Sequence, residues 1–142
     1  MKKKTKAKQP PVKQVTLILA DAHNNYQYYQ RCIDAVPEAT EVVFLGDYWD
    51  DWGDNPTEAM WMAKFLKSKL DLPNYHFLLG DHDCYAFPHN EHLRCPGFTV
   101  EKLAAIKPFI PDFSKFKLLH KTQGFLLSHA GIVEKLFSHP IR

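Results

Sequence analysis

Cysteine is scarce in this sequence, and long apolar runs are missing. The three cysteines, Cys32, Cys84 and Cys95, are odd in number and lack metal-site spacing, so we expect reduced thiols in a cytoplasmic protein. A disulfide between Cys84 and Cys95 stays open as an alternative. The apolar run Val15–Ala20 is too short to cross a membrane, and Asp21 follows it where a signal peptide would have a small-residue cleavage site.

Acidic residues are absent from residues 1–13, which hold six lysines, so the rest of the chain carries a net charge of −4. This segment has almost nothing apolar to bury, and we expect a disordered basic tail ahead of a single domain, 14–142. Its lysines could contact nucleic acid, which is one hypothesis for the function of the chain. We prefer the interpretation that the tail is a solvated leader.

Four short apolar runs predict β-strands, and they lie at Val15–Ala20, Glu41–Leu45, Tyr75–Leu79 and Gly124–Ser128. Helical patterns fall between the first three, over Tyr26–Val36 and from Pro56 to Leu70. Asn55 is the expected N-cap of the second helix, with Pro56 at its first position. The alternation of strands and helices indicates an α/β fold with parallel strands.

The second half of the chain has a weaker pattern. We expect a helix near Thr99–Ile106 and a short one at Ile132–Phe137. Between them, Lys115–His120 and Gly124–Ser128 predict a hairpin joined by the turn Lys121–Gly124.

An aspartate or a histidine follows each predicted strand, in the segments Asp21-Ala-His23, Asp47-Tyr-Trp-Asp50, Asp81-His82-Asp83 and His129. A single Asp after a strand is usually a turn or cap residue, but four such strand ends in one chain favour a common functional site. In open α/β sheets the carboxyl ends of the strands form the ligand site, so we expect all four ends at one edge. Mixed carboxylate and imidazole ligands suit Zn, Mn or Fe, and bound cations would relieve the repulsion between the carboxylates.

These residues, in this order, resemble the calcineurin-like metallophosphoesterase superfamily, whose motifs run D-x-H, G-D-x-x-D, G-N-H-[DE] and a later G/S-H. The matching segments are Asp21–His23, Gly46–Asp50, Gly80–Asp83 and Ser128–Gly131. The resemblance covers about residues 14–131. It implies an α/β fold with a metallophosphoesterase-like β-sheet core flanked by helices and two divalent metal ions, commonly Mn, Fe or Zn.

The resemblance also implies the metal ligands. Asp21 and His23 would bind the first metal ion, and Asp47 would bridge both ions. Asp81 and His129 would bind the second.

The implied catalytic residues are His82, which would protonate the departing alkoxide, and Asp50, the acid that orients it. The implied activity is hydrolysis of phosphate mono- or diesters. Phosphorylated small molecules, nucleotides and phosphoproteins are the expected substrate classes.

Three features depart from the family pattern. Asp81 stands at the position of the usual Asn, and Asp51 stands where the protein-phosphatase branch has a phosphate-binding Arg. The later G-H-x-H motif is absent after Gly131, where His139 is the sole histidine, so we expect a domain truncated at its C-terminus. These departures favour the alternative of a catalytically impaired or non-catalytic binding or scaffold protein.

Two further groups of residues allow more than one interpretation. The aromatic residues Tyr48, Trp49 and Trp52 either stack on a nucleotide base or pack the loop, and we prefer packing. His89 and His92 fit no structural zinc pattern, and we expect them on the surface or facing a substrate.

Overall fold

The computed structural model describes residues 13–83, 85 and 94–131. The basic tail before Lys13, the histidines His89 and His92, and the predicted helix Ile132–Phe137 lie outside these residues. Within them, no helix is both long and apolar enough to cross a membrane.

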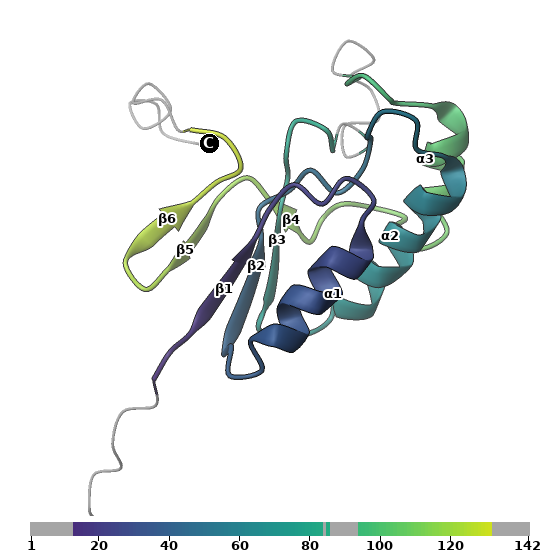
Figure 1. The fold of residues 1–142 in the computed structure, drawn as a ribbon. Helices are drawn as coiled ribbons and strands as arrows, with labels where there is room; N and C mark the ends of the chain where they lie inside the picture. Colours follow the sequence, from purple (N-terminus) through teal and green to yellow (C-terminus); the bar gives the residue numbers. More distant parts are fainter. Residues whose placement is uncertain (1–12, 84, 86–93, 132–142) are drawn as a thin grey trace, which may run out of the picture.

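Four parallel strands form the main sheet, in the same order as in the chain (Figure 1). They are β1 (Thr16–Leu19), β2 (Glu41–Phe44), β3 (Tyr75–Leu78) and β4 (Phe116–Lys117). The first three confirm the predicted runs, with β1 one residue shorter at each end and β2 and β3 one residue shorter at the C-terminal end. The register sets Thr16 opposite Glu41 and Val43 opposite His76.

Three helices lie on one side of this sheet (Figure 1): α1 (Tyr26–Ala35), α2 (Pro56–Lys69) and α3 (Val100–Ile106). The start of α2 is fixed by a capping box, because the Asn55 side chain accepts hydrogen bonds from the N–H groups of Thr57 and Glu58 while the Glu58 carboxylate accepts one from the Asn55 N–H. The core lies between helices and sheet, where the rings of Phe44 and Phe77 stack 5.1 Å apart.

The hairpin β5 (His120–Thr122) and β6 (Phe125–Leu127) forms a separate antiparallel sheet on the side of β1 away from the helices (Figure 1). The hairpin is confirmed, but Lys115–His120 is not one strand, since Phe116–Lys117 pairs with β3 instead. The turn is Gln123–Gly124, with φ of 46° and 85°, a short turn of the kind that joins antiparallel strands.

The strand predicted at Gly124–Ser128 therefore belongs to the hairpin and not to the parallel sheet. A two-residue turn cannot join parallel neighbours, which need a long crossover connection. The chain segment after β6 still reaches the carboxyl edge of the sheet, but it arrives there from the hairpin.

Candidate metal centre

The loops that follow β1 and β2 run side by side beyond the ends of the strands. The Leu45 N–H donates to the Leu19 carbonyl at 2.7 Å, the Asp21 N–H to the Gly46 carbonyl at 3.3 Å, and the His23 N–H to the Asp47 carbonyl at 3.1 Å. Backbone pairing thus places the D-x-H segment directly against Asp47.

The backbone of these loops is in an uncommon conformation. Asp21, His23, Asp47 and Asp50 all have positive φ, between 39° and 63°. This left-handed region costs about 1–2 kcal/mol for a residue with a Cβ, and Asp, Asn and His tolerate it best. Such strain collects at functional sites, and here it coincides with the residues that the motifs single out.

Two groups of side chains meet at this edge, and Asp47 belongs to both. Asp21, His23 and Asp47 form the first group, and Asp47, Asp81 and His129 form the second, with one ligand atom of each residue within 4.8 Å of the others in its group. Asp47 Oδ2 lies 3.8 Å from His23 Nε2 and 3.5 Å from His129 Nε2. The structure thus brings together all five residues predicted to bind metal.

Main-chain carbonyls orient two histidines. His23 Nδ1 lies 3.1 Å from the Trp49 carbonyl oxygen, and His82 Nδ1 lies 2.9 Å from that of Asp50. A carbonyl oxygen only accepts, so each Nδ1 carries a proton and each neutral ring keeps its lone pair on Nε2. Histidines that bind metal are commonly held in this way.

Two glycines allow the loops to approach each other. A Cβ on Gly80 would overlap the carboxylate and the main-chain nitrogen of Asp47. A Cβ on Gly46, which has φ of 118°, would overlap the backbone of Gly80. Glycine is therefore required at both positions for Asp47 to sit where it does.

A buried carboxylate, Asp83, binds the backbone of the loop that carries Asp47. It accepts hydrogen bonds from the main-chain N–H groups of Gly80 at 2.7 Å, Asp47 at 2.9 Å and Tyr48 at 2.9 Å. Burial raises the pKa of Asp83 to about 8, while these hydrogen bonds act in the opposite direction. The sequence placed Asp83 in a motif but gave it no role.

Comparison with known proteins identifies the family. The profile of the calcineurin-like phosphoesterases matches residues 15–141, nearly the whole chain. The chain belongs to this family. Searches among curated proteins and among solved structures gave no match. The resemblance seen in the motifs is confirmed, and the parallel sheet with its helices is the core that the family implies.

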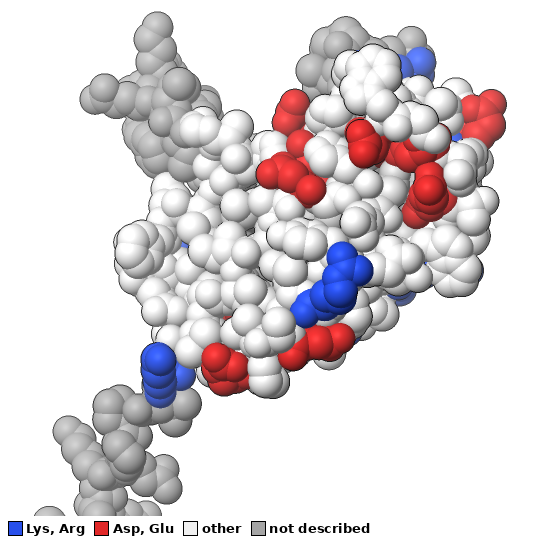
Figure 2. Space-filling model, in the orientation of Figure 1, with Lys and Arg blue, Asp and Glu red and all other residues white. Residues whose placement is uncertain are grey.

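The donor set of this calcineurin-like phosphoesterase fits a pair of divalent ions. Each group offers two carboxylates and one imidazole, the mixture that Mn, Fe and Zn accept. Asp21 and Asp81 extend into solvent, whereas Asp47 is buried between them. Figure 2 shows acidic side chains gathered along this edge of the molecule. Cations would neutralise the repulsion among them.

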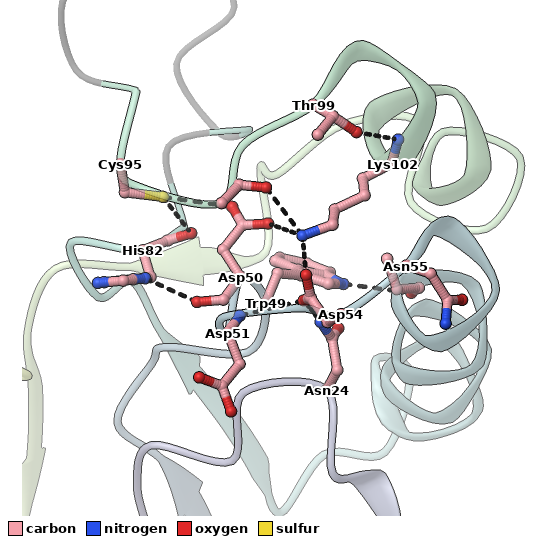
Figure 3. A network of polar contacts seen from close by, with 12 residues as sticks. Asn24, Trp49, Asp50, Asp51, Asp54, Asn55, His82, Cys95, Thr99 and Lys102 are labelled. Carbon is pink, nitrogen blue, oxygen red and sulfur yellow. Dashed lines mark hydrogen bonds and ion pairs between the residues drawn. The ribbon is translucent and has the colours of Figure 1, made fainter.

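The carboxylate of Asp50, in contrast, points toward Lys102 and not toward the His82 ring (Figure 3). It accepts hydrogen bonds from Tyr85 Oη at 2.6 Å, Cys95 Sγ at 3.2 Å and Lys102 Nζ at 3.1 Å. Asp50 contacts His82 through its main-chain carbonyl, so any orienting effect on that ring passes through the backbone.

Lys102 is a buried neighbour of Asp50 that the sequence did not reveal. Its ammonium group contacts the carboxylates of Asp50 and Asp54 and lies 2.8 Å from the Gly97 carbonyl oxygen, with a side chain only 2% exposed (Figure 3). Burial alone would lower the pKa of Lys102, but the hydrogen bonds to Asp54 and Asp50 outweigh it and the pKa is raised. A lysine within a short helix carries no sequence signal for such burial.

A pocket of about 450 Å³ adjoins His23 at the carboxyl edge of the sheet. The residues that line it include the acids Asp51, Asp54 and Glu58, and none of those described is Lys or Arg. Exposed Trp52 also lines it.

The aromatic residues of the same loop divide into two kinds. Tyr48 and Trp49 are fully buried, which confirms the packing interpretation for them, whereas Trp52 is 88% exposed. Only Trp52 of the three is therefore available to a ligand.

Proposed function

We propose that this calcineurin-like phosphoesterase hydrolyses phosphate mono- or diesters with the help of two divalent metal ions. The observation that carries the proposal is that Asp47 belongs to both ligand groups, flanked by a histidine on each side. Asp21 and His23 would hold the first ion, Asp81 and His129 the second, and Asp47 both. When bound, such a pair supplies positive charge to the phosphate oxygens and lowers the pKa of water.

His82 is the residue that we assign to proton transfer. Its main-chain N–H donates to Asp47 Oδ1 at 3.0 Å, and its ring meets the ring of His23 edge to face at 5.0 Å. With Nδ1–H held by the Asp50 carbonyl, Nε2 is the atom that would first take up a proton from water and then give it to a departing alkoxide. Asp50 then acts as a positioning residue for His82.

The experiment is hydrolysis of p-nitrophenyl phosphate and its bis-ester in Mn²⁺, for wild type and His82→Ala. Alanine keeps the main-chain bond to Asp47, so we expect metal content to be unchanged while kcat falls about 10²- to 10⁴-fold. Asp71→Asn, an exposed acid paired with Lys115 away from the edge, is the control and should keep wild-type activity. If wild type and His82→Ala are equally inert with metal bound, the catalytic proposal fails.

One observation favours a second candidate, a protein of this fold that binds metal without turnover. The pocket beside His23 has acids and no described cation on its wall, and Asp51 occupies the position of an arginine in related phosphatases. Negative charge here repels a phosphate ester. Asp51→Arg distinguishes the candidates, because a rise in kcat/KM indicates an enzyme limited by substrate binding, whereas metal binding with no turnover in either form supports the binding protein.

A further inference from the structure

A second cluster of ligand-type side chains lies away from the edge just described. Glu41 is the first residue of β2, His76 belongs to β3 and His120 begins β5 (Figure 1). Since Val42, Phe44 and Phe77 of these strands pack into the core beneath the helices, the alternation of side chains points Glu41 and His76 to the opposite face. His120 approaches that face from the hairpin.

The two histidine side chains converge on one carboxylate oxygen of Glu41. Glu41 Oε1 lies 2.9 Å from His120 Nε2 and 3.2 Å from His76 Nε2. The two imidazole rings stack with centroids 4.0 Å apart and planes inclined by 21°. One ligand atom of each residue therefore lies within 4.8 Å of the other two.

The other oxygen of Glu41 is already occupied. Glu41 Oε2 accepts a hydrogen bond from Thr16 Oγ1 at 2.8 Å and another from Thr122 Oγ1. The two hydroxyl groups fix the carboxylate so that Oε1 faces the histidines. Metal-binding carboxylates are held by hydrogen bonds of this kind.

We propose that Glu41, His76 and His120 bind a Zn²⁺ ion, at a site separate from the metal centre at the sheet edge. Two imidazoles and one carboxylate, with a fourth position left to water, are a ligand set that zinc accepts. Zinc–ligand bonds of about 2.0–2.1 Å in a tetrahedron separate neighbouring ligand atoms by about 3.3 Å. The distances of 2.9 and 3.2 Å at Glu41 Oε1 need little change to reach this value.

The cluster is accessible to an ion from solvent. The side chains of Glu41, His76 and His120 are 12–24% exposed, which leaves a route from solvent. A bound ion would replace the contacts to Oε1 and tie the hairpin to β2 and β3.

The test is to count zinc ions per chain after dialysis of the full-length protein against Zn²⁺. Wild type should bind one zinc ion more than His76→Gln or His120→Gln. His129→Gln removes a histidine at the sheet edge and serves as the matched control, which should keep this additional ion. Zinc should raise the Tm of His129→Gln, because binding to the folded state stabilises it, and should raise it less in the His120→Gln, His129→Gln double variant.

Thr122→Val is a second test for the case in which a histidine variant misfolds. It changes one hydroxyl to a methyl group and keeps all three ligands. Loss of a partner of this kind weakens metal binding about 10- to 100-fold. The proposal is overturned if natively folded His120→Gln retains every zinc ion of wild type, or if Thr122→Val binds zinc as tightly as wild type does. Glu41 and the histidines would then form a hydrogen-bonded cluster only.

Discussion

The Asp83 carboxylate lies under the Asp47 backbone and accepts a 2.9 Å hydrogen bond from the Asp47 N–H. The same carboxylate accepts from Gly80 and Tyr48, so it joins the segment after β2 to the segment after β3. Asp83 does not face the proposed metal ions. Its contribution is to give the Asp47 loop its shape before any ion binds.

Replacing Asp83 with Ala should lower the free energy of unfolding by about 3 kcal/mol, because three buried N–H groups lose their acceptor. Urea unfolding with a chelator present measures the change without the metal ions. Asp83→Asn keeps one oxygen as an acceptor and should lose less stability than Asp83→Ala. Equal stability of Asp83→Ala and wild type would contradict the role given to this residue.

Gly80→Ala should prevent metal binding at the edge, because the added Cβ overlaps the Asp47 carboxylate. We expect Mn²⁺ content and activity to fall together, and the metal content of the dialysed protein measures this. Gly53→Ala is the control, since a Cβ there meets nothing within 4 Å, although its φ of 82° adds backbone strain. Full metal content in Gly80→Ala would show that the two loops separate easily.

Asp47→Asn should reduce metal binding at both groups, whereas Asp21→Asn should reduce it at one. Asparagine tolerates positive φ, so the backbone of each loop is retained. Metal analysis of the two variants beside wild type gives the comparison. Asp71→Asn, an exposed acid paired with Lys115, should keep the wild-type content. Identical losses in the Asp47 and Asp21 variants would argue against a shared ligand.

Lys102→Met should destabilise the protein by about 3–5 kcal/mol, since it leaves the Asp50 and Asp54 carboxylates buried without their cation. The pKa of Lys102 is raised above 10.5, so the stability it contributes is complete below pH 10.5 and is lost as pH rises through the higher, folded-state value. Thermal unfolding of wild type and Lys102→Met across alkaline pH tests both statements. A difference in Tm between wild type and Lys102→Met that stays the same at every pH would rule out this titration.

Acid should weaken the attachment of the hairpin through Glu41. Burial opposes ionisation of this carboxyl, but hydrogen bonds from Thr122, His120 and Thr16 outweigh it and lower its pKa below 4.5. A lowered pKa stabilises the fold above pH 4.5, and the contribution is lost as pH falls through the folded-state value. Unfolding with a chelator present should therefore show a smaller acid-dependent loss in Glu41→Gln than in wild type, and equal losses would refute the assignment.

Much of the edge could be predicted because its residues follow strands directly. Asp21, Asp47 and Asp81 come within a few residues of β1, β2 and β3, so local sequence fixes where they emerge. The parallel order of the strands then brings them to the same end of the sheet. Four of the five proposed metal ligands, all except His129, reach this edge for that reason.

The remaining features depend on contacts between distant segments. The burial of Lys102 arises from the packing of α3 beside the Asp50 loop, and its sequence neighbours do not differ from those of a surface helix. The direction of the Asp50 side chain is set by the same contacts. The strand predicted at Lys115–His120 was wrong because Phe116–Lys117 and His120–Thr122 are nearly continuous in sequence yet join different sheets.

His129 arrives from the hairpin, whereas the other four proposed ligands follow strands of the parallel sheet. A chain made from its N-terminus leaves the ribosome with Asp21, His23 and Asp47 well before His129. The first ligand group is then complete while the second still lacks its only imidazole. The order of the chain therefore delivers the residues of the Asp21 group before the imidazole of the His129 group.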